Sequence, residues 1–129
     1  MKRILLIEND FDLALSIKLG IDLIETLPLE KEIEYDGTSA LERVKCPPAP
    51  DLLILDMHLP SVAGQDIYET VRQTLPGCKV IIITADIRLA KEIQEKEGDW
   101  QILPAPDALF TKPFSIIEFK ETVEKLVAD

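Results

Sequence analysis

The chain has 129 residues, 47% of them hydrophobic, which is enough to build the core of one domain. Its 24 acidic side chains outnumber 14 basic ones, and a net charge of -10 disfavours direct binding to nucleic acid or to an anionic membrane surface. No apolar run approaches membrane-spanning length, and Cys46 and Cys78 lack the paired spacing of zinc or redox motifs, so we expect a soluble protein with two free thiols in the cytoplasm.

Four short runs rich in branched apolar side chains, and a fifth run that is more polar, predict β-strands. They are residues 4–7, 30–35, 52–55, 80–83 and 108–110. Four of these runs lack polar alternation, as in parallel strands that are covered on both faces of a sheet. The run 30–35 is more polar, so we expect it at an edge.

Segments of helical periodicity separate these runs. The first has Leu13, Ile17, Ile21 and Ile24 on one face. The others are residues 38–44, 64–75, 87–96 and 115–127. Strands that alternate with helices predict an α/β fold: a single doubly wound (βα)5 domain, with a five-stranded parallel sheet of order 2-1-3-4-5 and helices on both faces.

Two smaller features concern helix starts and a loop. Ser39 with Glu42, and Ser115 with Glu118, have the S-x-x-E spacing of a helix start. Residues 97–107 form a long segment without a strand or helix pattern. Trp100 in this segment has two interpretations: it is an anchor for a partner protein, or its side chain pins the segment to the core.

Polar residues follow four of the predicted strands. Glu8-Asn9-Asp10 follows the first, Asp56 the third, Thr84 the fourth and Lys112-Pro113 the last. The carboxyl ends of parallel strands share one edge of the sheet, where ligands bind in such folds. The expected strand order places Glu8 and Asn9 beside Asp56. Each residue alone has an ordinary explanation, such as a helix cap, but helix capping does not account for all four strand ends together.

The chemistry of these groups indicates phosphoryl transfer assisted by a metal ion. Clustered oxygens favour a hard cation such as Mg²⁺. Asp56 is then a nucleophile that forms an acyl phosphate. Lys112 as a point charge and Thr84 as a hydroxyl donor can hold the phosphoryl oxygens.

Four motifs, in this order and spacing, resemble the response-regulator receiver domain of two-component signalling, of the chemotaxis-regulator-like superfamily. They are KRILLIEND from residue 2, DLLILDMHLP from residue 51, IIITA from residue 81 and FTKPF from residue 110. The resemblance covers nearly the whole chain, and we interpret residues 1–129 as one such domain.

The resemblance implies a role for each site residue. Asp56 is the phosphoacceptor, with Thr84 and Lys112 on the phosphoryl oxygens. Glu8, Asn9, Asp56 and the backbone carbonyl of His58 stand at the positions that hold Mg²⁺. The Lys112-Pro113 bond is expected to be cis, as in the family. The side chain of His58 is either an influence on hydrolysis of the acyl phosphate or a solvated residue at the rim.

The resemblance also implies a signalling role. The phosphoryl donor would be a histidine kinase or a histidine phosphotransfer protein, and the only catalysis would be the domain's own phosphorylation and dephosphorylation. Phosphorylation would draw Thr84 inward and change the surface formed by residues 87–96, 108–110 and 115–127, where a downstream protein would bind. We expect no output domain within this sequence, since it ends about one helix after Lys112.

Three departures from the family pattern suggest a rival function. Asn9 is neutral where an aspartate is usual, which should weaken Mg²⁺ binding. Leu109 stands at the switch position usually held by an aromatic residue, and Phe110 should face the opposite side of its strand. The segment 97–107 is also longer than usual. The main alternative is therefore a pseudo-receiver that binds proteins independently of phosphate; a phosphohydrolase or a flavin protein of similar fold receives less support.

Overall fold

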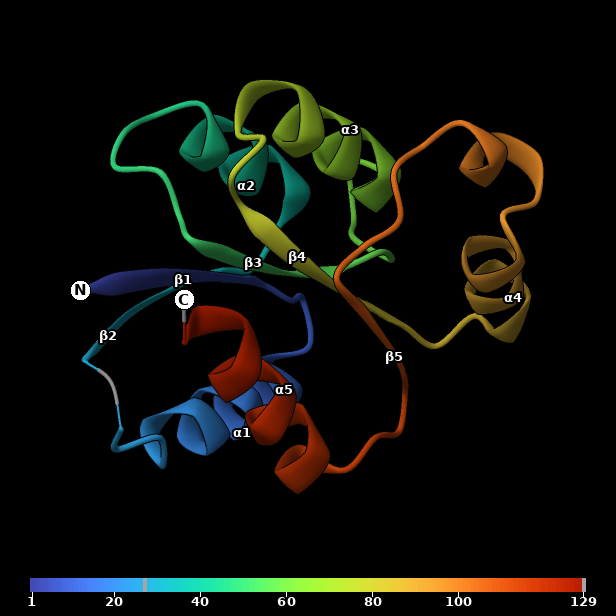
Figure 1. Cartoon of the computed structure of the whole chain (residues 1–129). Coiled ribbons are helices and arrows are strands. Elements are labelled where there is room, and N and C mark those ends of the chain that lie inside the picture. Colours follow the sequence, from blue (N-terminus) through green and yellow to red (C-terminus); the bar gives the residue numbers. More distant parts are fainter. Residues whose placement is uncertain (27, 129) are drawn as a thin grey trace.

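The computed structural model describes residues 1–26 and 28–128 as an α/β structure built on one parallel sheet (Figure 1). The strands are β1 Lys2–Ile7, β2 Leu29–Glu34, β3 Leu52–Asp56, β4 Lys79–Thr84 and β5 Ala108–Thr111. The helices are α1 Phe11–Asp22, α2 Gly37–Val44, α3 Gly64–Thr74, α4 Ile87–Glu95 and α5 Ile116–Val127, with a short 3-10 helix η1, Gly98–Gln101. The strand order is β2-β1-β3-β4-β5, so the predicted order and the edge position of the second strand are confirmed.

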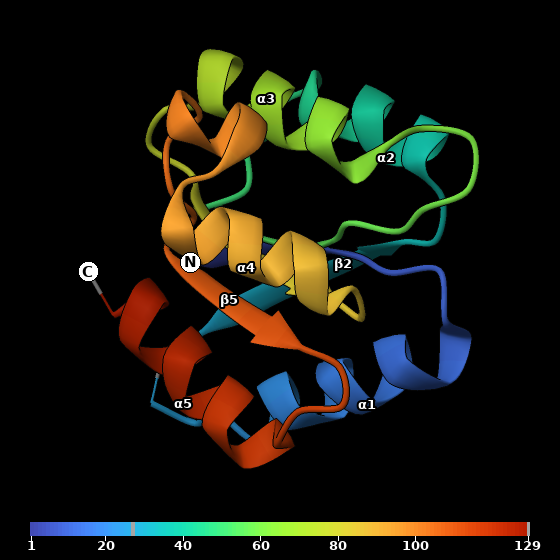
Figure 2. The same ribbon diagram turned by 90° about the vertical axis from the view of Figure 1, so that its right-hand side faces the viewer.

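Helices cover both faces of the sheet. In Figure 1, α2 and α3 lie on one side, and α1 and α5 lie on the other. Figure 2 shows the same two layers from the edge, with α4 lying beside β5. No helix in the described part of the chain combines the length and the apolar character that crossing a membrane requires.

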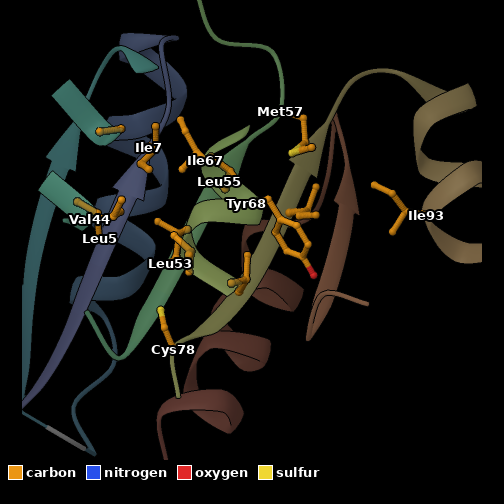
Figure 3. Packing of buried hydrophobic residues seen from close by; sticks show 14 of the residues in the cluster. Leu5, Ile7, Val44, Leu53, Leu55, Met57, Ile67, Tyr68, Cys78 and Ile93 are labelled. Atoms are coloured by element: carbon orange, nitrogen blue, oxygen red, sulfur yellow. The ribbon is translucent and has the colours of Figure 1, made fainter. Parts of the chain in front are cut away.

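Alternate residues of the central strands pack into two separate cores, one on each face of the sheet, because successive side chains of a strand point to opposite faces. Leu5 and Leu53 pack with α2 and α3, in the cluster drawn in Figure 3. Ile4 and Ile54 pack with α1 and α5 on the opposite face. Burial on both sides explains why these strands are continuously apolar.

The segment 97–107 is packed against the body of the domain. Trp100 is buried, and its ring lies 5.1 Å from that of Tyr68 on α3. The Tyr68 hydroxyl donates to the carbonyl of Pro104 at 2.5 Å, and Arg72 donates to the carbonyl of Ala105 at 3.0 Å. Of the two interpretations of Trp100, the structure therefore supports the one in which it pins its own segment to the core.

In the described part of the chain, side-chain caps mark the starts of four helices, α1, α2, α4 and α5. The Asp10 carboxylate accepts from the backbone N–H of Leu13 at 3.1 Å, and the Ser115 hydroxyl accepts from that of Glu118 at 3.2 Å, so the predicted cap at Ser115 is confirmed. The predicted helix start at Ser39 is wrong. Asp36 caps α2 instead, since its carboxylate accepts from the backbone N–H of Ser39 at 2.8 Å, which places Ser39 inside the first turn of the helix.

Candidate functional site

The predicted site residues meet at the carboxyl edge of the sheet. The register pairs Asp56 at the end of β3 with Ile83, one residue before Thr84 at the end of β4. Glu8 follows the last residue of β1, and Lys112 follows the last residue of β5. Beside the apolar and aromatic core, the buried polar residues in the described part of the chain are Glu8, Asp56 and Thr84. Burying these groups is costly unless they are paired, so their pairing determines what the site can do.

Lys112 lies between the two buried carboxylates. Its Nζ is 3.0 Å from Glu8 Oε1 and 3.4 Å from Asp56 Oδ2. Burial alone would lower the pKa of Lys112, but its hydrogen bond to Glu8 and the charge of Asp56 outweigh that effect and raise the pKa. The lysine therefore stays charged at neutral pH. The Lys112-Pro113 peptide bond is cis, as expected.

Glu8 is the group whose protonation the pocket changes most. Burial, together with a hydrogen bond to Asp56 and the Asp56 charge, raises the pKa of Glu8 from 4.5 to about 7. The backbone N–H of Asp10 and the side chain of Lys112 act in the opposite direction and lower this pKa. Glu8 Oε2 accepts from the backbone N–H of Asp10 at 3.0 Å. Within residues 1–26 and 28–128, Glu8 Oε1 makes only the ion-pair contact with Lys112 and no well-aligned hydrogen bond. The pocket thus holds more negative charge than its one lysine balances.

This pKa shift gives a pH dependence that can be measured. The native state holds the Glu8 proton more tightly than the unfolded chain, so this stabilisation is complete below about pH 4.5 and is lost as the pH rises through about 7. We expect the free energy of unfolding of the metal-free protein to fall by up to about 3 kcal/mol from this group across that range.

Urea denaturation in EDTA, at several pH values from about 5 to 8, measures the effect. The control is Glu8→Gln, which keeps the shape of the side chain and removes the titrating proton. We expect the stability of the variant to vary less with pH than that of the native chain. Parallel pH profiles for the two proteins would contradict the assigned pKa.

Asn9 places its side-chain amide over the same carboxylates. The three oxygens around it are all acceptors, so the amide nitrogen faces them. In this orientation, which its acceptor neighbours assign, the amide nitrogen donates to Asp56 Oδ2 at 2.8 Å, to the His58 carbonyl at 3.2 Å and to Glu8 Oε2 at 3.3 Å. The neutral residue at this position therefore acts as a hydrogen-bond donor to the oxygens of the pocket.

His58 contacts the site with its side chain as well as its backbone. Its Nε2 lies 3.1 Å from Thr84 Oγ1, and its backbone N–H donates to Asp56 Oδ1 at 3.0 Å. Thr84 Oγ1 also accepts from the backbone N–H of Asp86 at 3.0 Å. His58 is exposed, as expected for a residue at the rim, and its ring is in addition hydrogen-bonded to Thr84. No feature of the sequence pairs these two residues.

The two neighbouring residues of β5 face opposite layers, as predicted. Leu109 packs against the core that contains Trp100. Phe110 packs on the other side, 5.1 Å from the ring of Phe119. Leu109 also lines a groove of about 160 Å³ between β5 and the end of α4.

The oxygen donors of the site could hold a hard cation, but only two of them are acidic side chains. Within the described residues, no three histidine, cysteine, aspartate or glutamate side chains are grouped to hold a metal ion. Two carboxylates, those of Glu8 and Asp56, converge with the carbonyl of His58 and the amide of Asn9. Glu8 Oε1 lacks a hydrogen bond there. Oxygen donors with unbalanced negative charge fit Mg²⁺, which often takes one or two carboxylates and completes its shell with water.

Two curated proteins illustrate the range of sizes among similar chains. The chain is 33% identical over 125 residues to a protein of Haloferax volcanii; the match covers 96% of this chain and spans 19% of that protein. It is 28% identical over 130 residues to the polar-differentiation response regulator DivK of Brucella ovis, covering 99% of this chain and 98% of DivK.

Two solved structures share the fold. A CheY-like response regulator receiver domain protein from Methanospirillum hungatei superposes with a TM-score of 0.80 at 24% identity, covering 98% of this chain and 94% of that chain. The response regulator TrrA from Thermotoga maritima, in complex with Mg²⁺-BeF, gives 0.74 at 25% identity and covers 98% and 100%.

A family model settles the relationship. The model of the response regulator receiver domain matches residues 4–124. Receiver domains of two-component response regulators are signalling switches that depend on phosphorylation, and they are not classical enzymes. This chain belongs to the response regulator receiver domain family.

Proposed function

We propose that the chain is a phosphorylation-dependent switch of a two-component phosphorelay, with Asp56 as the phosphoacceptor. The observation that carries the proposal is the position of Lys112, whose Nζ lies 3.0 Å from Glu8 and 3.4 Å from Asp56, both of them buried carboxylates. A fixed cation beside the carboxylate reduces its repulsion of an incoming phosphoryl group. Residues 1–129 are proposed to act as one receiver unit in the cytoplasm.

The proposed reaction is nucleophilic transfer to a carboxylate oxygen of Asp56. That oxygen attacks the phosphorus of a phosphohistidine, the phosphorus–nitrogen bond breaks, and its electron pair leaves with the histidine of the donor. The product is an acyl phosphate on Asp56. Lys112 pairs with a phosphoryl oxygen, and the hydroxyl of Thr84 donates to another. Reaching that oxygen requires Thr84 to exchange its contact with His58 for one with the phosphoryl group.

The same pocket is proposed to hold Mg²⁺. Glu8, Asp56, the side-chain oxygen of Asn9 and the carbonyl of His58 would hold the ion. When bound, the ion supplies positive charge that offsets the charges of the carboxylates and the phosphoryl group.

We propose a histidine kinase or a histidine phosphotransfer protein as the donor. The output would pass through the face formed by α4, β5 and α5 to a downstream protein. The groove beside Leu109 lies on this face and is lined mainly by apolar side chains, which suits an apolar side chain of that partner. We propose no direct binding of nucleic acid or membrane, because the net charge of the chain is -10.

Mass spectrometry of the intact protein tests the proposal. After incubation with acetyl phosphate and Mg²⁺, we expect one phosphoryl adduct on the native chain and none on Asp56→Asn. Asp10→Asn is the matched control: it removes a nearby carboxylate, but asparagine caps helices as well as aspartate does, so the adduct should persist.

The second candidate function is a phosphate-independent binding module. Asn9 favours it, because its amide already pairs with the oxygens that would face a metal ion. If the native chain gains no adduct while a known receiver gains one in parallel, the switch proposal fails and this candidate replaces it.

A further inference from the structure

The side-chain amide of Asn9 occupies an unusual position for a neutral residue. Its nitrogen is surrounded by three oxygens at 2.8, 3.2 and 3.3 Å, which belong to Asp56, His58 and Glu8. Two of the three come from carboxylates of buried residues, and hydrogen bonds to charged acceptors are stronger than those between neutral groups. The amide protons therefore neutralise part of the negative charge that Lys112 leaves unbalanced.

The three oxygens are those on which the proposed magnesium site depends. A nitrogen donor and a cation cannot share the same three oxygens, because both need to approach the same lone pairs. A metal ion can enter only if the amide leaves. Rotation of the amide about its last side-chain bond would exchange the nitrogen for the oxygen, which can ligate a metal ion.

We propose that Asn9 is an amide gate, in which the nitrogen takes the place of the cation in the metal-free pocket and the oxygen faces the cation after rotation. The inference rests on the proposed magnesium site. It predicts two opposite effects of one residue. Asn9 stabilises the metal-free protein, and it lowers the affinity for Mg²⁺, since binding must first break three hydrogen bonds. Asn9 would then set the magnesium concentration at which Asp56 becomes reactive.

Substitution of Asn9 by aspartate separates these effects. The introduced carboxylate would have the same shape as the amide, could not donate a proton when ionised and would add a third negative charge. We expect Asn9→Asp to raise the unfolding equilibrium constant in EDTA by about tenfold and to tighten Mg²⁺ binding by about tenfold or more. Calorimetric titration with MgCl₂ and urea denaturation measure the two quantities. A surface asparagine with no role in the pocket would give neither change.

The rotation itself has a direct spectroscopic signature. In ¹H–¹⁵N spectra, the side-chain amide signals of Asn9 are identified as those missing from Asn9→Asp. We expect these protons to exchange slowly with water in EDTA and much faster when Mg²⁺ saturates the site. Fast exchange without Mg²⁺, or slow exchange retained at saturation, would overturn the gate.

The outcomes distinguish this inference from the proposed function. Binding of Mg²⁺ with unchanged Asn9 signals overturns the gate and leaves the magnesium site intact. Absence of Mg²⁺ binding by both the native chain and Asn9→Asp overturns the magnesium site and the gate together. Phosphorylation of Asp56, measured separately by mass, tests the switch itself.

Discussion

Replacing Gly64 with alanine is expected to lower the free energy of unfolding by about 3 kcal/mol or more. A Cβ atom at this position would lie 2.6 Å from Met57 Cα and 2.9 Å from the Met57 carbonyl oxygen. Both are backbone atoms of the segment directly after Asp56, so neither can rotate away as a flexible side chain could. The start of α3 must shift or the site segment must, and we expect phosphorylation of Asp56 to fall as well.

Gly77 provides the matched control in the same chain. A Cβ atom there would meet nothing within 4 Å, and its φ lies outside the left-handed range. Gly77→Ala should therefore leave stability unchanged or raise it by about 0.5 kcal/mol, because alanine restricts the unfolded chain. Urea denaturation followed by circular dichroism measures both variants. Equal stability of Gly64→Ala and Gly77→Ala would show that the backbone beside Asp56 yields without cost.

Trp100→Ala is expected to cost about 3–5 kcal/mol, the usual range for removal of a large buried aromatic side chain. Trp100 is 2% exposed and packs against Tyr68 in the core between the sheet and α3. The loss would free residues 97–107 from the body of the domain. We expect faster amide hydrogen exchange in that segment than in β1, because the central strands retain their own packing.

Trp100→Phe is the informative companion variant. The buried indole Nε1 has no hydrogen-bond partner among the residues that the structure describes, so phenylalanine removes an unsatisfied donor while it keeps most of the apolar contact. We expect its cost to be less than half that of the alanine variant. Similar losses for the two variants, again by urea denaturation, would mean that the indole nitrogen is paired in solution.

The fold was largely predictable because its signals are local. Continuously apolar runs such as residues 52–55 indicate strands covered on both faces, and the polar run 30–35 indicates an edge strand. The structure confirms both positions. The predicted helical segment 38–44 agrees with α2 to within one residue, but the helix start that the S-x-x-E spacing placed at Ser39 was wrong, because aspartate and serine both cap helices and Asp36 is the cap.

The location of the candidate site was also predictable, because the residues that end parallel strands meet at one edge. Its internal pairing was not. The contact between His58 and Thr84 joins residues 26 positions apart, and it depends on how the His58 side chain reaches from the segment after β3 to the end of β4. The same holds for Asn9, whose missing charge was evident from sequence although its hydrogen bonds were not.

The residues of the candidate site stand at the ends of separate strands, so the site forms only when those strands are correctly paired in the sheet. Glu8, Asp56, Thr84 and Lys112 come from the ends of four different strands, and Lys112 follows the edge strand β5. A slip of one residue in any of these strands would turn its side chain to the other face. If Asp56 is the phosphoacceptor, as proposed, its phosphorylation would be an all-or-none reporter: a chain that has lost the pairing of even one of these strands would keep Asp56 but have no assembled site.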